Sequence, residues 1–383
     1  MKKVLFLLSF ISLGLFAYGQ DSNDALLKKL VEKNVITQAE ADSLSLFASE
    51  EKKSNLSPKN TLEKIKETVT SPALQLGGYS LFMYKYSDLE NVKHSAEPRV
   101  VFLSLKGEPI KNFKYCVFAD LAHATIYEFY GEWTPSAAFN VRLGQAKTPL
   151  SIENQLSLTA IEGVLNTRSI SALMGMKDDV MYLQDKISSA GRDIGVKIYG
   201  ELIKTKTHNL LGYDIGLYQG TGLNTKDNNN TKDFAANVLL QPIKGFRIGG
   251  GAYFGQATYL KPGDLEVSDH VRNRWIFSSD YKFDQFYARL EWIIGNDGGI
   301  KKEGLNGMGM YYFVPSKFNS FAKVDYLNQD KSTNNELMEY TVGVNYYFYK
   351  TCRLQLNYTH TDYSKKWGAR DSNVVIAQLQ IVY

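Results

Sequence analysis

From about Leu74 to the final Tyr383, the sequence is a succession of short segments in which apolar and polar residues alternate. Because successive residues of a strand point to opposite faces, each segment would carry one apolar and one polar face. The predicted strands are 74–86, 97–107, 111–122, 124–134, 138–147, 191–203, 208–219, 233–241, 245–259, 271–282, 284–297, 305–313, 317–328, 337–350, 353–363 and 372–383. These sixteen antiparallel strands predict an all-β fold, and an even number of strands can close into a transmembrane barrel with lipid outside and water inside.

The distribution of charge between the two faces supports the barrel. Phe286, Leu290 and Trp292 share one face of their predicted strand, and Arg289 and Glu291 share the other. A lysine or arginine that faces lipid at mid-membrane costs about 2–4 kcal/mol, so a membrane barrel should confine its charges to the inner face. A soluble antiparallel sandwich would show the same alternation. The signal sequence, the number of strands and the end of the chain favour the barrel over that alternative.

The two ends of the chain indicate export and membrane insertion. Residues 1–19 have the basic start, apolar centre and small-residue cleavage site of a signal peptide, although a signal anchor is an alternative. Residues 20–73 predict a short helical periplasmic segment followed by a polar tether, or else a disordered spacer. The barrel is predicted over 74–383, and its last strand alternates apolar residues up to the aromatic Tyr383. We therefore expect a location in the outer membrane of a Gram-negative bacterium.

The connections between the predicted strands alternate in length. Short turns interleave with longer polar connections at 87–96, 148–190, 220–232, 260–270, 298–304, 329–336 and 364–371, with one short exception near Ala122. This alternation is typical of barrels with short periplasmic turns and long outer loops. The long third outer loop, 148–190, contains apolar and partly helical material that needs a surface to bury against. We expect it to fold into the lumen; the alternative is an outer loop packed on other loops or on a neighbouring subunit.

A group of motifs resembles a known family. Leu143-Gly-Gln145, Lys147-Thr-Pro149 with Glu153, Arg168-Ser169 and Arg192-Asp-Ile-Gly195 are similar to the central signature of the phosphate-selective porin O and P family of Gram-negative outer membranes. The helical segment before the barrel also resembles that of members from Bacteroidota. The resemblance implies a 16-stranded barrel, commonly a homotrimer, whose third outer loop enters the lumen. It also implies anion channels lined by a ladder of arginines, of which this chain has few.

The charges predicted to face the lumen are nearly balanced in sign, which favours a weakly selective pore with a mild preference for anions. The chain carries a formal charge of +4, which is too small to indicate a nucleic-acid partner. The predicted function is passive diffusion of small polar or anionic solutes, including phosphate, through a lumen narrowed by loop 148–190. Outer-membrane lipid would be a further partner. The candidate lining and constriction residues are Arg142, Lys147, Glu153, Glu162, Arg168, Lys197, Arg247, Arg289, Lys323 and Arg353.

Other functions find little support in the sequence. The catalytic and nucleotide-binding motifs Gly-x-Ser-x-Gly, His-Glu-x-x-His and Gly-x-x-x-x-Gly-Lys are absent from it, and so is Cys-x-x-Cys. We therefore expect no enzyme, no cofactor and no metal site. A barrel-embedded hydrolase and a plugged structural or adhesive barrel remain as alternatives.

Overall fold

The computed structural model describes residues 31–33, 70–89, 91–185, 189–261 and 263–383. The chain divides into two units, Met1–Val69 and Thr70–Tyr383. In the first unit, residues 31 and 32 are helical and residue 33 forms a turn, whereas the predicted signal peptide 1–19 and most of the predicted segment 20–73 lie outside the described residues. Among the described residues, no helix combines the length and apolar character needed to cross a bilayer.

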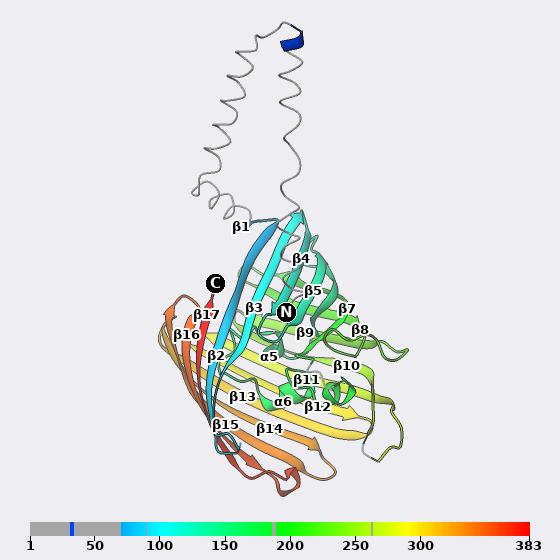
Figure 1. The fold of residues 1–383 in the computed structure, drawn as a ribbon, viewed down its shortest axis with the longest axis vertical. Helices are drawn as coiled ribbons and strands as arrows, with labels where there is room; N and C mark the ends of the chain where they lie inside the picture. Colours follow the sequence, from blue (N-terminus) through cyan, green and yellow to red (C-terminus); the bar gives the residue numbers. More distant parts are fainter. Residues whose placement is uncertain (1–30, 34–69, 90, 186–188, 262) are drawn as a thin grey trace. The chain divides into compact units, whose positions relative to one another are not determined.

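The second unit consists mainly of long antiparallel strands (Figure 1). Every strand predicted from the alternation is present, with ends that differ by a few residues. The strands are β1 (Thr70–Ser71), β2 (Leu74–Ser87), β3 (His94–Ile110), β4 (Phe113–Asp120), β5 (Thr125–Trp133), β6 (Asn140–Lys147), β7 (Arg192–Lys204), β8 (Asn209–Tyr218), β9 (Asp233–Ile243), β10 (Phe246–Tyr259), β11 (Ser268–Phe283), β12 (Phe286–Asp297), β13 (Ile300–Val314), β14 (Phe318–Asp330), β15 (Asn335–Tyr349), β16 (Cys352–Tyr363) and β17 (Ser372–Val382).

The strands β2 to β17 form a closed barrel. Each strand pairs with the next one along the chain, and the last strand, β17, pairs antiparallel with β2 from Val374 opposite Ser87 to Val382 opposite Tyr79. The short β1 only extends the start of β2, where Thr70 lies opposite Gln75. Closure leaves no unpaired strand edge, which is the condition for a sheet to span lipid. The predicted 16-stranded antiparallel barrel is confirmed.

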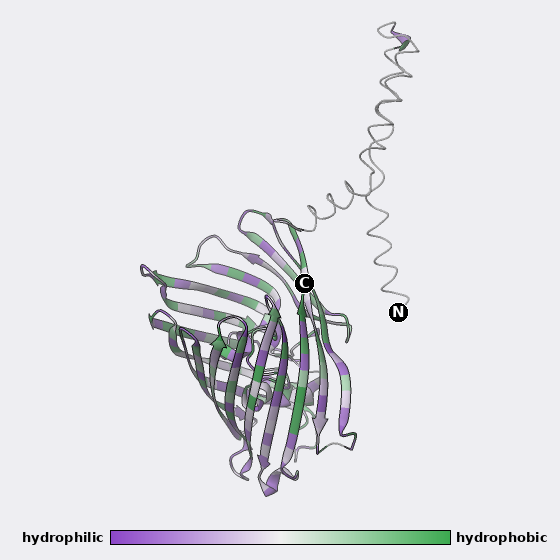
Figure 2. Cartoon of the chain, turned by 90° about the vertical axis from the view of Figure 1, so that its left-hand side faces the viewer, coloured by the Kyte–Doolittle hydropathy of each residue, from purple (hydrophilic) through white to green (hydrophobic). Residues whose placement is uncertain are grey.

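The two faces of the barrel wall differ as the alternation predicts. On β12, Phe286, Leu290 and Trp292 are 42–46% exposed, whereas Arg289 and Glu291 are buried. Figure 2 shows the same alternation as green and purple bands along individual strands. The exposed face is therefore the apolar outer wall, and the charged face turns inward.

Two predicted long connections are shorter in the structure. The predicted loop 298–304 is wrong: β12 and β13 meet in a tight hairpin at Gly298 and Gly299, whose φ angles of 56° and 93° suit a two-residue turn. The predicted loop 329–336 is likewise too long, since β14 runs to Asp330 and β15 starts at Asn335. Both errors have one cause: the strands continue in polar residues beyond the apolar band, where composition no longer marks the end of a strand.

The long connection between β6 and β7 carries three short helices, α5 (Ile152–Gln155), α6 (Arg168–Leu173) and α7 (Asp179–Asp185). It is the third connection at its end of the barrel, after those that follow β2 and β4. A single turn of 3-10 helix, η1 (Lys365–Trp367), lies between β16 and β17.

Arginine substitutions at two depths in the membrane test which face of the wall contacts lipid. Val342 lies in the middle of β15 and is 53% exposed, and Tyr349 ends the same strand and is 60% exposed. We expect Val342→Arg to destabilise the barrel by about 2–4 kcal/mol and Tyr349→Arg by about 0–1 kcal/mol, because the cost of a lipid-facing arginine falls toward the interface. Urea unfolding in lipid vesicles measures both. Equal costs would contradict the assigned outer wall.

Candidate functional site

The connection between β6 and β7 is attached to the inner wall by Glu291 of β12. The carboxylate of Glu291 accepts hydrogen bonds from the backbone N–H of Ile152 at 2.6 Å, the N–H of Glu153 at 3.2 Å and the hydroxyl of Ser151 at 3.0 Å. These N–H groups open helix α5 and have no partner within the helix. The wall carboxylate supplies that partner and fixes the start of α5 against β12.

A second wall carboxylate holds helix α6 in the same way. Asp325 of β14 accepts hydrogen bonds from the backbone N–H groups of Arg168 and Ser169, the first two residues of α6. Its carboxylate is completely buried. Both helices in the first part of the segment therefore start on a carboxylate of the barrel wall, where the positive end of the helix favours a negative charge.

Arg289 forms the central ion pair of the attachment. Its guanidinium donates to Glu153 at 2.7 Å and to Glu162 at 2.9 Å, and all three side chains are at least 95% buried. Burial alone would raise the pKa of Glu153, but the charges of Arg289 and Lys323 and the hydrogen bonds from Thr167 outweigh it and hold that pKa below its ordinary value. Glu153 therefore stays ionised and bound to the wall.

Other wall side chains complete the attachment along the segment. Arg353 donates to the carbonyl of Ile161, Lys323 to that of Leu165, Arg274 to that of Leu173, Arg272 to the carboxylate of Asp178 and Lys302 to that of Asp179. Apolar residues of the segment are buried with apolar residues of the wall: Leu150, Ile170 and Leu173 with Ile276, Ile293 and Leu327. The segment therefore lies along the inner face of β10–β17 and reaches β2 and β3, inside the ring of strands (Figure 1).

Open space remains on the other side of the lumen. Three cavities, of about 420, 650 and 280 Å³, are lined mainly by residues of β2–β10. The cavities of 420 and 650 Å³ share Gln155 of α5, which lies between them. The open space in the lumen therefore lies mainly along the wall of β2–β10.

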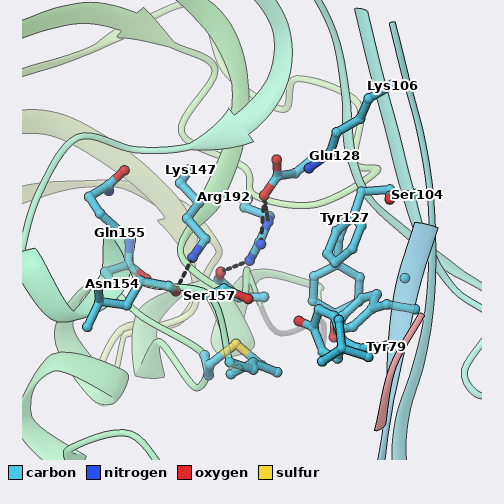
Figure 3. Close-up of a pocket in the computed structure, with 18 of the residues that line it drawn as sticks. Tyr79, Ser104, Lys106, Tyr127, Glu128, Lys147, Asn154, Gln155, Ser157 and Arg192 are labelled. Atoms are coloured by element: carbon cyan, nitrogen blue, oxygen red, sulfur yellow. Dashed lines mark hydrogen bonds and ion pairs between the residues drawn. The ribbon is translucent and has the colours of Figure 1, made fainter. Parts of the chain in front are cut away.

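The 420 Å³ cavity carries an excess of positive charge. Lys106, Arg142, Lys147 and Arg192 line it together with Glu128, and Arg142 is paired with Glu132 at 2.6 Å. Figure 3 shows Lys147 and Arg192 side by side in this cavity, with Arg192 bound to Glu128. Lys147 donates to the carbonyl of Leu156 at 2.6 Å.

The structure separates the candidate residues into groups. Glu153, Glu162, Arg289, Lys323 and Arg353 meet around the attached segment. Arg142 and Lys147 line the 420 Å³ cavity, Arg247 lines the 650 Å³ cavity, and Lys197 pairs with Asp214, another residue of that cavity, at 2.6 Å. Arg168 stands apart: its guanidinium lies 3.4 Å from Glu339, and its side chain is 45% exposed.

Sequence reasoning missed Arg192 as a cavity residue. Val196 and Ile198 of the same strand are exposed on the outer wall, so strict alternation would turn Arg192 outward as well. It turns inward instead, just after a sharp bend in which Ala190 and Gly191 have φ angles of 48° and 67°. The glycine before the strand is the only local signal of that bend. The anchoring roles of Glu291 and Asp325 were also missed, since their partners are backbone groups that carry no sequence signature.

Comparisons with known proteins agree with this architecture. The sequence model of the family "Phosphate-selective porin O and P" matches residues 276–383. The resemblance to that family is confirmed over this last part of the barrel. The motifs that first suggested it, between Leu143 and Gly200, lie outside the matched residues. A comparison with curated protein sequences finds no match.

Several solved outer-membrane proteins share the fold. The anion-selective porin from Comamonas acidovorans is 10% identical, with a TM-score of 0.59 over 81% of this chain and 99% of that chain. The outer membrane channel DcaP of Acinetobacter baumannii is 11% identical, with a TM-score of 0.57 over 81% and 97%. OmpT of Vibrio cholerae, in a trimer form, is 12% identical, with a TM-score of 0.57 over 81% and 100%. At such identities the likeness concerns the fold.

The central ion pair can be tested by removing its cation. Arg289→Ala would leave Glu153 and Glu162 buried without their guanidinium, and we expect it to destabilise the protein by about 3 kcal/mol or more. Lys232→Ala is the control, because Lys232 is 51% exposed and its partner Asp227 is 22% exposed, so this change should cost about 0–1 kcal/mol. Urea unfolding compares the two variants.

A double-mutant cycle with Glu162→Gln then isolates the pair itself. We expect Glu162→Gln to cost less in the Arg289→Ala background than in the unchanged protein, since its partner is already gone. Additive costs, or an equal loss of stability from Arg289→Ala and Lys232→Ala, would contradict the assigned attachment.

Proposed function

We propose that the chain forms a water-filled channel through the outer membrane, by which small polar and anionic solutes diffuse passively. The observation that carries the proposal is the division of the lumen: the segment between β6 and β7 is attached to one wall, and cavities of about 420 and 650 Å³ lie along the other. A loop that folds inward narrows a barrel of this size without closing it. Export by the predicted signal peptide 1–19 is part of the proposal.

A preference for anions follows from which of the inward-facing charges are already paired. The arginines and lysines of β11–β16 are bound to the attached segment or to neighbouring wall carboxylates. Of the four cations that line the 420 Å³ cavity, Arg142 pairs with Glu132 and Arg192 with Glu128, whereas Lys106 and Lys147 have no ion pair among the described residues. Fixed charge along a passage selects ions by sign. The anion-selective porin from Comamonas acidovorans, which shares the fold, offers a parallel. Phosphate is one anion that such a passage would admit.

The two alternatives receive less support. A plugged structural barrel fits less well with the cavities of 420 and 650 Å³ beside the segment. A barrel-embedded hydrolase would need an activated nucleophile, and the histidine best placed for that role, His360 on β16, has both ring nitrogens engaged, by Asp362 at 2.8 Å and by Asn373 at 2.9 Å. Among the described residues, no group of three or more histidine, cysteine, aspartate or glutamate side chains is placed to hold a metal ion.

The charge on Lys147 provides the test of selectivity. We expect Lys147→Glu to lower the permeability ratio of chloride to potassium by roughly two-fold or more, because it places a carboxylate beside the passage. Reversal potentials across a salt gradient in planar bilayers measure this ratio. Lys317→Glu, the same change in an exposed turn between β13 and β14, is the control and should leave the ratio unchanged.

Arg168→Ala in the same assay tests the other proposed constriction residue. Because Glu339 lies beside the Arg168 guanidinium, we expect a smaller effect than that of Lys147→Glu. An unchanged ratio in Lys147→Glu would contradict the proposed anion path, and a protein that gives no steady conductance would contradict the channel itself.

We further propose a homotrimer in which the wall of β4–β6 faces a neighbouring subunit. The strands β4, β5 and β6 have 8, 9 and 8 residues, whereas β13 and β15 have 15 each. Eight tilted residues rise roughly 19 Å along the membrane normal, which is less than the apolar band of about 25 Å. This low wall carries the exposed apolar residues Ile126, Phe129, Trp133 and Leu143.

Paired truncations on two walls test this arrangement. We expect Phe129→Ala with Leu143→Ala to lower the temperature at which the trimer dissociates by several degrees, since both side chains are more than 60% exposed on the low wall. Leu290→Ala with Leu356→Ala, on the outer face of the longer strands β12 and β16, is the control and should leave that temperature unchanged. Semi-native gel electrophoresis after heating follows the dissociation. A monomer, or equal effects of the two pairs, would contradict the proposed interface.

A further inference from the structure

One side of the 420 Å³ cavity is an aromatic surface built by β2, β3, β4 and β5. The rings of Phe102 and Phe118 stack with centroids 4.2 Å apart, Tyr127 meets Phe102 edge-on at 4.8 Å, and Tyr79 lies 5.0 Å from Phe102. Phe102 is almost completely buried beneath its neighbours, whereas Phe118 and Tyr127 keep part of their surface exposed. All four rings line the cavity.

The cations of the cavity lie beside this aromatic surface. Lys147 and Arg192 are direct cross-strand neighbours on β6 and β7, so two positive charges lie close together. Glu128 binds Arg192 at 2.8 Å and offsets its positive charge. The Arg192 guanidinium lies 5.1 Å from the centre of the Tyr127 ring. In the described part of the chain, the Lys147 ammonium is paired with no carboxylate and makes one hydrogen bond, to a backbone carbonyl. One positive charge therefore remains for a solute.

We propose that this cavity binds organic anions that carry a flat apolar group, with the anionic group at Lys147 and the flat group on Phe118 and Tyr127. The proposal deepens the proposed channel function and rests on it. Figure 3 shows the two sides of the cavity, with Lys147 and Arg192 on one side and Tyr79 and Tyr127 on the other. The volume falls within the range of small-molecule sites, and a benzoate- or phenyl phosphate-sized molecule fits with water around it.

The aromatic surface distinguishes this class of solute from inorganic anions. Phosphate or chloride would use the ammonium of Lys147 and gain nothing from the rings. An aromatic anion would also cover the exposed parts of Phe118 and Tyr127, and offset or edge-on contacts between rings are favourable beyond the area they bury. Asn154, Gln155 and Ser157 line the cavity as well and supply polar groups to orient the anionic end.

Block of the chloride current in planar bilayers tests the proposal. The probes are phenyl phosphate, methyl phosphate and benzyl alcohol, which separate the contribution of the ring from that of the charge. We expect phenyl phosphate to reach half-block at a concentration about three- to ten-fold lower than methyl phosphate, which corresponds to one ring contact. Benzyl alcohol, which has the ring without the charge, should not block at those concentrations.

Two variants test which side chain contacts the ring of the solute and which binds its anionic group. Phe118→Leu keeps an apolar side chain but removes the ring, and should abolish the advantage of phenyl phosphate without changing the block by methyl phosphate. Lys147→Met should weaken the block by both phosphates. The controls are Phe313→Leu, which removes a ring that is 58% exposed on the outer wall, and Lys317→Met in the exposed turn. Neither control should alter the block.

The outcomes separate this inference from the channel function. A conducting protein that phenyl and methyl phosphate block equally would overturn the inference alone, and so would an advantage that persists in Phe118→Leu. Block by benzyl alcohol at similar concentrations would overturn the role of the charge. A protein without steady conductance would overturn the channel and the inference together.

Discussion

Pairing of the first barrel strand with the last is the constraint on which the rest of the structure depends. Strands β2 and β17 come from opposite ends of the described barrel, and their register from Val374–Ser87 to Val382–Tyr79 satisfies the backbone groups that either edge would otherwise expose to lipid. Only a closed sheet separates an outer face from an inner one. The confinement of charge to the inside, the burial of Arg289 and Glu291, and the attachment of a long segment to the inner wall all require that separation.

Inside the closed wall, charge serves two different purposes. On β11–β16 the inward cations and carboxylates hold the segment between β6 and β7, and several of them bind backbone groups, as Glu291 binds the start of α5 and Arg353 the carbonyl of Ile161. Side chains that are saturated in this way contribute little field to a passing solute. On the opposite wall, Lys147 binds the segment only through the carbonyl of Leu156, and the 420 Å³ cavity leaves open space beside it. The attached segment therefore sets both the width of the passage and its charge.

The alternation of side chains made the barrel predictable, because the two-residue period of a strand must match a boundary between lipid and water. It located all sixteen membrane strands but not the tight turn at Gly298 and Gly299, where the strands extend past that boundary in polar residues. Contacts between distant parts of the chain could not be predicted. Nothing local to Arg289 indicates Glu153 and Glu162 as its partners, and alternation assigns Arg192 to the wrong face.

The position of the aromatic surface follows from the same arrangement. Apolar side chains on the inner wall need cover from water, and on β2 and β3 part of that cover comes from the segment itself, since Leu158 and Ile161 are buried with Tyr79, Leu81 and Phe102. The cover ends where the segment turns away, so Phe118 and Tyr127 lie at its margin and keep exposed surface. Rings that continue a buried cluster into a water-filled passage cost free energy unless something else covers them, and a solute with a flat apolar group beside Lys147 would do so.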